Sequence, residues 1–387
     1  MNRVCSIFAQ LLQLFPRVKF EQLVKEHQAE RHSRGFSSWA QFVAMLFCQV
    51  GQAKSLREIC NGLMAIEGKL KHLGVLSPPN KSTLAYANEN RPWELYESVF
   101  NQLLANCHQQ ASGSKKFRFK NKLVSMDSST IDLCASVFDW AKFKRAKGAV
   151  KVHLLLDHEG YLPCFAHITD GKSSDIAVAR GLKFQSGTIV VMDRGYVDYG
   201  WWDQLTQQGV YFVTRLKKDI LWDEVESRQP PQNSNVIGDQ IIRIRKSVQY
   251  QMETKFRIVT ILDEDGKELS FLTNHLELGA TTIARIYKDR WKIEIFFKCL
   301  KQLARVKTFV GTSANALKTQ LWAALIAVLI LKLLQLKSKF NWSLSHLVAL
   351  LRQQLFVYRD LYKWLDDPFQ APPILDGVHD GQLLLEF

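Results

Sequence analysis

The chain has 387 residues, of which 47% are hydrophobic and 23% are charged. These proportions are typical of folded globular proteins and exclude a disordered or collagen-like chain. Lysine and arginine number 51 against 37 aspartate and glutamate, so the formal net charge is +14. A balance this basic favours phosphate-rich partners, above all nucleic acid.

The seven cysteines are scattered and form no C-x-x-C pair. We therefore expect neither a disulfide framework nor a zinc knuckle, and we expect a reduced, cytoplasmic protein. The longest uninterrupted apolar run, residues 321–331, is shorter than the roughly 18–20 residues of a membrane span. We predict that this run forms a buried core helix and that the protein has no membrane partner.

Residues 1–110 show apolar residues at helical spacing and few β-branched runs, which predicts an all-α DNA-binding domain. Within it, residues 55–64 predict one helix, and Ser82 is a good N-cap for a second helix that ends near Arg91. This pair is compatible with a helix-turn-helix reader and also with an ordinary helical hairpin. The candidate DNA contacts here are Lys81, Ser82, Thr83, Tyr86 and Arg91.

Residues 111–216 have the pattern of an α/β core. Three sequential strands are followed by alternating helices and strands, which predicts antiparallel pairing first and parallel pairing afterwards. The predicted strands lie at 123–126, 150–156, 161–169, 188–192 and 210–214, and the predicted helices at 174–183 and 199–207.

Residues 217–276 lose the helical period. Their β-rich segments, around residues 241–244, 256–262 and 269–273, and the hairpin-turn sequence at 263–266 predict a β-rich insertion. A long helix at 281–307 then resumes the α/β fold, so residues 277–336 complete the core, and residues 337–387 form a C-terminal helical region.

Two aspartates occupy matching places, because Asp127 and Asp193 each follow a methionine at the end of a strong β run. Strand ends are where α/β sheets place ligands. A single aspartate in such a place is also typical of a turn or a helix cap.

The long predicted helix carries a polar stripe whose members are 3, 4, 4 and 3 residues apart. Apolar residues flank the stripe, so we place it at the core boundary. The alternative is an exposed salt-bridge ladder. The stripe consists of Tyr287, Arg290, Glu294, Lys298 and Lys301.

Asp127, Asp193 and Glu294 together predict metal-dependent phosphodiester chemistry. Two Mg²⁺ ions, or Mn²⁺, held by carboxylates can activate the nucleophile and stabilise the leaving oxygen. The cations of the stripe would then lie along the phosphates that approach the metals.

Tyr287, Arg290, Glu294 and Lys301 match every spacing of the Y-x2-R-x3-E-x6-K signature. In this the sequence resembles the DDE transposases of bacterial insertion sequences, specifically the insertion-sequence-four family. Met-Asp127-Ser-Ser and Met-Asp193-Arg-Gly-Tyr resemble its two aspartate motifs, and the Phe-Leu-Thr-Asn at 271–274 resembles the end of its β insertion. The resemblance spans about residues 38–335.

This resemblance implies an RNase H-like core in which Asp127, Asp193 and Glu294 bind metal, interrupted by the β insertion. It also implies Mg-dependent cut-and-paste excision and strand transfer, acting on terminal inverted repeats and target DNA, with a homodimer in the synaptic complex. Two other functions stay open at this point. They are an RNase H-like nuclease or resolvase without strand transfer, and a non-catalytic DNA-binding regulator.

Further cations are candidates for contacts to the DNA backbone. Lys142, Lys144 and Arg145 belong to a basic segment between the first two core strands, where a solvated hairpin is the alternative. Arg194, Arg215 and Lys217 follow core strand ends. Three aromatic residues could stack a displaced base or pack in the core: Tyr196, Trp201 and Trp202.

Overall fold

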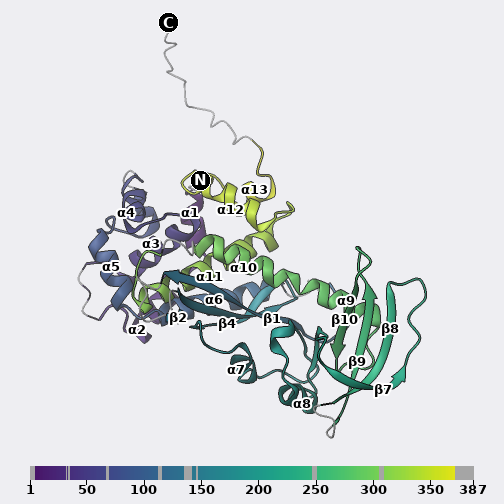
Figure 1. Cartoon of the computed structure of the whole chain (residues 1–387). Helices are drawn as coiled ribbons and strands as arrows, with labels where there is room; N and C mark the ends of the chain where they lie inside the picture. Colours follow the sequence, from purple (N-terminus) through teal and green to yellow (C-terminus); the bar gives the residue numbers. More distant parts are fainter. Residues whose placement is uncertain are drawn as a thin grey trace.

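The computed structural model has helices gathered at one end and strands at the other (Figure 1). The consecutive helices α9 (Ala280–Asp289) and α10 (Trp291–Ala304) run from the strand-rich end towards the helical end. The residues that the structure describes are 5–31, 33, 35–66, 69–111, 116–134, 142–144, 147–245, 251–304 and 309–370.

The described part of residues 1–111 is helical, which confirms the predicted all-α region. Ser37 and Ser55 cap two of the helices, since their hydroxyls accept hydrogen bonds from the backbone N–H groups of Ala40 and Glu58 at 3.1 Å. The helices are α1 (Ile7–Leu12), α2 (Arg17–Glu26), α3 (Ser38–Val50), α4 (Leu56–Met64), α5 (Lys81–Asn90) and α6 (Glu94–Ala111).

The start of α5 differs from the prediction. The residue before the helix is Asn80, with φ −75° and ψ 146°, so Ser82 lies inside the first turn and is not the N-cap. The two prolines at 78 and 79 explain the difference, because they keep the chain extended until Asn80 and the helix can begin directly after it.

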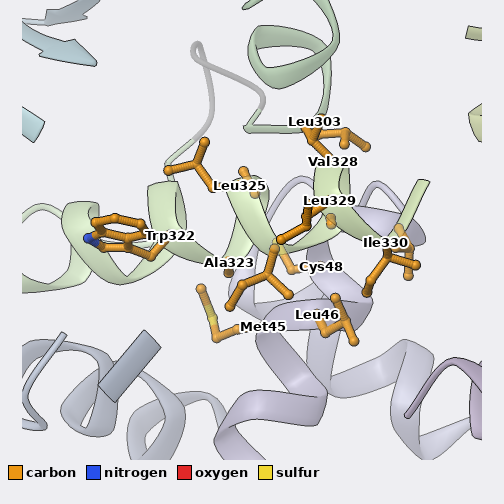
Figure 2. Close-up of a cluster of buried hydrophobic side chains, with 14 of the residues drawn as sticks. Met45, Leu46, Cys48, Leu303, Trp322, Ala323, Leu325, Val328, Leu329 and Ile330 are labelled. Atoms are coloured by element: carbon orange, nitrogen blue, oxygen red, sulfur yellow. The ribbon is translucent and has the colours of Figure 1, made fainter. Parts of the chain in front are cut away.

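Helix α11 (Ala314–Lys337) is the centre of the helical core and contains the apolar run predicted to be buried. It is long and apolar enough to cross a membrane, yet 83% of its most apolar window is buried inside the protein. Figure 2 shows part of the cluster around it, to which α3 contributes Met45, α10 Leu303 and α11 Leu325. The ring of Trp322 stacks on Trp93 at 6.4 Å.

This core continues beyond the amino-terminal helices. One cluster of buried side chains takes members from α1 to α6, from α10 and α11, and from the last two helices, α12 (Leu344–Gln354) and α13 (Leu361–Asp366). The chain ends of the helical region also meet, since Ile7 N donates to Val357 O at 3.1 Å. The amino-terminal helices therefore share their hydrophobic core with the carboxy-terminal ones.

The described strands form one ten-stranded sheet in the order β2-β3-β1-β5-β6-β10-β9-β8-β7, with β4 paired to β3. Strand β3 is antiparallel to both of its neighbours, β1 and β4, whereas β1, β5 and β6 run parallel to one another. The strands are β1 (Leu123–Cys134), β2 (Lys142–Lys144), β3 (Lys147–Asp157), β4 (Leu162–Asp170), β5 (Ile189–Met192), β6 (Tyr211–Arg215), β7 (Leu221–Ser227), β8 (Val236–Arg245), β9 (Gln251–Leu262) and β10 (Glu268–Thr273).

Helices cover both faces of the central strands. Ile189 and Val191 of β5 pack on the side of α9, and Val190 and Met192 pack on the side of α7 (Asp175–Arg180) and α8 (Tyr199–Gln207). This alternation follows from the two-residue period of a strand. Three antiparallel strands followed by two parallel ones, with helices on both faces, confirm the predicted RNase H-like core.

The predicted β insertion extends this same sheet, because β10 pairs with β6 in antiparallel register and β9, β8 and β7 follow outwards. Strand β7 was absent from the prediction. Its sequence, Leu-Trp-Asp-Glu-Val-Glu-Ser, is mostly exposed and carries three acidic residues, so it lacks the hydrophobic alternation of a half-buried strand. Charged residues are typical of such an edge strand.

Candidate active site

The sheet register brings Asp127 and Asp193 together. Strands β1 and β5 pair in parallel up to Met126 opposite Met192, so the two aspartates directly follow the last pair. Asp127 was predicted to end its strand, but β1 continues to Cys134 because its second half pairs only with β3. Asp127 nevertheless lies at the point where the parallel pairing of β1 with β5 ends.

Helix α10 brings Glu294 to the same place through Arg290. The two guanidinium nitrogens of Arg290 lie 3.2 Å from Asp127 Oδ2 and 2.6 Å from Glu294 Oε1. Burial opposes the charge of Arg290, but Tyr287, Glu294 and Asp127 together raise its pKa. A charged guanidinium therefore joins the two carboxylates.

The pKa of Asp127 reports on all three acids. Burial raises it to about 6 against the opposing charge of Arg290 and the hydrogen bond from Ser128 N, and the charges of Asp193 and Glu294 raise it further. The strand register and the contacts of Arg290 agree with these effects, because they bring Asp193 and Glu294 near Asp127. Asp193 is half-buried, and its Oδ1 accepts a hydrogen bond from Gly195 N at 2.7 Å.

The predicted single helix at 281–307 is wrong in one respect, because the chain forms two helices that meet at Arg290. Arg290 N donates to both Ile286 O and Tyr287 O, and the helical geometry tightens there. Neither proline nor glycine lies nearby to break the helix locally. The last residue of α9, Asp289, instead has its carboxylate bound by residues of other elements.

An open cavity of about 480 Å³ lies beside the acids. It places the second half of the predicted stripe, Lys298 and Lys301, in the same cavity as Asp127 and Glu294. Both lysines are exposed on α10. The cavity is lined by Asp127, Ser128, Ser129, Glu294, Phe297, Lys298, Lys301 and Gln302.

The first half of the stripe lines a different cavity. Tyr287 and Arg290 border a space of about 720 Å³ between α9 and the β9–β10 turn. Trp291, which is 60% exposed, borders it too and was missed by the sequence analysis. The sequence did contain a signal for Trp291, because it is a bulky aromatic residue beside two charged positions of the helix stripe, Arg290 and Glu294. Arg290 thus stands between two cavities.

The other predicted cations of the core differ in placement. Arg194 is exposed directly after Asp193, whereas Arg215 and Lys217 are half-buried near the end of β6. The charge of Arg215 acts on the pKa of Tyr287, so the end of β6 faces the stripe. Lys142 and Lys144 fall in β2, and Arg145 lies outside the described residues.

The aromatic candidates for base stacking pack in the core. Tyr196 and Trp201 are each 3% exposed and Trp202 is fully buried, stacked on Phe212 at 5.0 Å. Trp202 also meets Phe256 of β9, so this cluster joins the core to the insertion. These three residues therefore pack in the core, which was the alternative to stacking a displaced base.

In the amino-terminal region, four of the five candidate residues form one exposed face of α5. Lys81, Ser82, Thr83 and Tyr86 are all exposed, with Tyr86 at 68%. The guanidinium of Arg91 instead donates to Gln41 Oε1, to Ser33 Oγ and to the Phe36 carbonyl. Arg91 therefore ties α5 to the start of α3.

The connection between α4 and α5 does not fit a helix-turn-helix. It spans residues 65–80 and includes a 3₁₀ helix, η1 (Lys69–Leu73). A helix-turn-helix has a turn of only about 3–4 residues. The connection is also longer than the short loop of an ordinary helical hairpin, the alternative that the sequence left open.

Residues 118–330 match the family described as "Transposase DDE domain", and residues 4–76 match a domain of unknown function (DUF4372). The first match covers more than half of the chain, so the chain belongs to the DDE transposase domain family. It is therefore a transposase, an enzyme that cleaves and transfers DNA strands, and enzymes with this domain generally use a divalent metal ion.

Named relatives agree with this assignment. The chain is 29% identical to the "Putative transposase y4zB" of Sinorhizobium fredii, over 78% of this chain and 83% of the relative. It is 30% identical to the "Probable transposase for insertion sequence element IS5377" of Geobacillus stearothermophilus, over 68% and 70%. The structure also aligns with a solved piggyBac transposase synaptic complex with hairpin DNA, over 96% of this chain and 84% of the piggyBac chain. The sequence identity is 10% and the TM-score is 0.46.

Proposed function

We propose that Asp127, Asp193 and Glu294 are the metal-binding catalytic triad of this transposase and that it performs cut-and-paste excision and strand transfer. The single observation that supports this best is that the sheet register and Arg290 bring the three acids to one region of the protein. The parallel register of β1 and β5 places two of them side by side, and Arg290 ties the third to Asp127 at 2.6 and 3.2 Å.

The donor set suits a hard divalent cation. Carboxylate oxygens are the preferred ligands of Mg²⁺ and Mn²⁺. Asp127 and Glu294 already share one positive group, the guanidinium of Arg290, which marks the space between them as one that requires a cation. Within the described residues, no three His, Cys, Asp or Glu side chains are grouped closely enough to hold a metal, and Arg290 stands between two of the acids.

We infer that two Mg²⁺ or Mn²⁺ ions bound by the triad supply an activated nucleophile and a stabilised leaving oxygen. Around them, the chain's own residues orient the DNA. Lys298 and Lys301 share a cavity with two of the acids, and as cations they would hold the phosphates of the strand to be cut. Arg194, Arg215 and Lys217 would extend this basic surface along the backbone.

The face of α5 formed by Lys81, Ser82, Thr83 and Tyr86 is the proposed surface for the element end. These side chains are exposed on one helix, and a lysine, two hydroxyls and an aromatic ring can contact phosphates and base edges. Arg91 would support this face from behind through its bonds to residues 33–41. We also propose that Lys142, Lys144 and Arg145 contact the DNA backbone.

The proposed substrates are double-stranded terminal inverted repeats and target DNA, joined by a homodimer because two ends must be brought together. We also propose that the reaction takes place in the cytoplasm, because the cysteines are scattered along the sequence and form no C-x-x-C pair, which is typical of proteins in a reducing compartment.

The test uses the purified full-length protein, the DNA that flanks its coding region on both sides, a target plasmid and Mg²⁺. We expect the DNA segment bounded by the two flanking ends to be released from its donor and then joined to the plasmid. Release without joining would instead identify a nuclease or resolvase. Binding without any cleavage would identify a non-catalytic regulator and would contradict the proposed triad.

A further inference from the structure

A second polar cluster lies immediately beside the active site, at the break between α9 and α10. Its centre is Asp289, which is 5% exposed. Asp289 Oδ2 lies 2.8 Å from His158 Nδ1 and accepts a hydrogen bond from the Tyr161 hydroxyl at 2.9 Å. Asp289 Oδ1 pairs with the ammonium group of Lys116. Three donors from distant parts of the chain therefore hold one carboxylate.

The cluster reaches the catalytic strand through His158. This residue lies in the turn between β3 and β4 and is 4% exposed, and its Nε2 lies 2.7 Å from Ser125 Oγ. Ser125 is fully buried on β1, two residues before Asp127. Residues two apart on a strand lie on the same face. A chain of hydrogen bonds thus connects the strand that carries Asp127 to the helix break that carries Arg290.

Serine, histidine and aspartate in this order, at these distances, are also the arrangement of a hydrolytic triad. Burial excludes that chemistry here, because a nucleophile must reach its substrate and Ser125 is 0% exposed. A cavity of about 190 Å³ is lined by His158 and Lys116, but neither Ser125 nor Asp289 is part of its lining. Ser125 and Asp289 are therefore closed off from a substrate, and the role of the cluster concerns the position of its neighbours.

The electrostatics fit a fixed anchor. Burial would raise the pKa of Asp289, but the hydrogen bonds from His158, Lys116 and Tyr161 prevail and lower it to about 2. An ionised carboxylate accepts hydrogen bonds and donates none, so the proton of the short contact lies on His158 Nδ1. Such charge-assisted bonds are stronger than neutral ones. They hold the end of α9 where no proline or glycine sets the break.

We propose that Ser125, His158 and Asp289 form a positioning relay that sets the helix break at Arg290 and, through it, the distance between Asp127 and Glu294. None of the three touches the reacting atoms, so they are positioning residues. The inference rests on the proposed function insofar as Asp127 and Glu294 are taken as metal ligands. Its structural half, the fixing of the helix break, can be measured without any cleavage.

The experiment compares Asp289→Asn with Asp239→Asn in the full-length protein. Asp239 is a matched control, because it is also 5% exposed and also held by a buried partner, Arg257, at 2.7 Å, but it lies in the β insertion. Three quantities are measured for each protein. They are hydrogen exchange across residues 286–296, the affinity for Mn²⁺ alone by electron paramagnetic resonance, and kcat for cleavage alongside the dissociation constant of end DNA.

We expect Asp289→Asn to increase hydrogen exchange selectively at residues 286–296 and to lower Mn²⁺ affinity and kcat by about 10- to 100-fold, with DNA affinity unchanged. Asp239→Asn should lower the thermal midpoint without these local effects. Ser125→Ala, a milder change that cuts the relay at β1, should shift the same quantities in the same direction. Ser125→Ala replaces Asp289→Asn as the test variant if Asp289→Asn does not fold.

Equal exchange at residues 286–296 in the relay variants and in Asp239→Asn would overturn the proposal. So would increased exchange there with Mn²⁺ affinity unchanged. Failure of the wild-type protein to cleave any flanking DNA would instead contradict the proposed function, and the exchange and Mn²⁺ measurements would still decide the relay.

Discussion

Two polar clusters flank the same peptide bond, between Asp289 and Arg290, and they differ in exposure and in charge balance. Around Asp289, three donors meet one carboxylate that is 3% exposed. Around Arg290, two carboxylates share one guanidinium, and Asp127 and Glu294 remain 18% and 33% exposed beside an open cavity.

The comparison shows how similar residue types serve different purposes. The Asp289 cluster is saturated, so it can only hold structure. The Arg290 cluster is incomplete, because two acids lack a second positive charge and Arg290 Nε is buried without a hydrogen-bond partner among the described residues. A cluster with unmet charge still has the capacity to bind a further charged partner, such as a metal ion or a phosphate. Exposure and charge balance, more than residue type, separate the proposed reactive cluster from the structural one.

The largest effect should come from the acids in and beside the Arg290 cluster. Asp127→Ala, Asp193→Ala and Glu294→Ala should each reduce strand cleavage by on the order of 10³-fold or more, since metal ligands act in the chemical step. Binding of end DNA should remain largely intact. Cleavage rates in Mg²⁺ and DNA affinity check this, and full cleavage by any one variant removes that residue from the triad.

The lysines of the same cavity should give the next largest effect. Lys301→Ala should slow cleavage by roughly 10²-fold with little change in the thermal midpoint, because a cation that stabilises the transition state acts on the rate. A surface salt-bridge partner would cost only about 0.3–0.5 kcal/mol of stability and no activity. Wild-type rates at saturating end DNA would exclude the phosphate role of Lys301.

The Asp289 cluster should affect how the stability of the protein depends on pH. The folded-state pKa of Asp289, about 2, lies below its unfolded value, so its stabilisation is present above pH 4 and lost as pH falls towards 2. Asp289→Asn should therefore be less stable than the wild type by about 2–3 kcal/mol at neutral pH. Denaturant unfolding should show the difference shrinking below pH 4. A constant difference would mean that ionisation of Asp289 contributes nothing.

The smallest effect concerns α5, where the same contrast separates Lys81 from Arg91. Lys81→Ala should leave stability unchanged and weaken DNA binding, with the salt dependence of log Kd reduced by about 1 for one lost phosphate contact. Arg91→Ala should lower stability, because it removes bonds to residues 33–41. An unchanged salt slope for Lys81→Ala would move end recognition away from this face of α5.

Strong local patterns made several features of the fold predictable. The helix of residues 199–207 was predicted with its observed bounds, and the core strands other than β1 were placed within about three residues, because their hydrophobic periods are those of a helix and of buried strands. Strand β7 was not predictable in this way, since an exposed, acidic edge strand has no hydrophobic period.

The sequence by itself determined the Met-Asp pairs that end at Asp127 and Asp193, the place of Glu294 on a helix stripe, and the alternation of strands and helices, because each depends on residue types at short spacing. Only the tertiary structure decided that the helix breaks at Arg290, since the bonds to Asp289 come from Lys116, His158 and Tyr161, far away in the chain. It also decided that Arg290 bridges two of the acids and that the amino-terminal helices share a core with α11. Such contacts depend on which elements meet in space, and no local pattern encodes that.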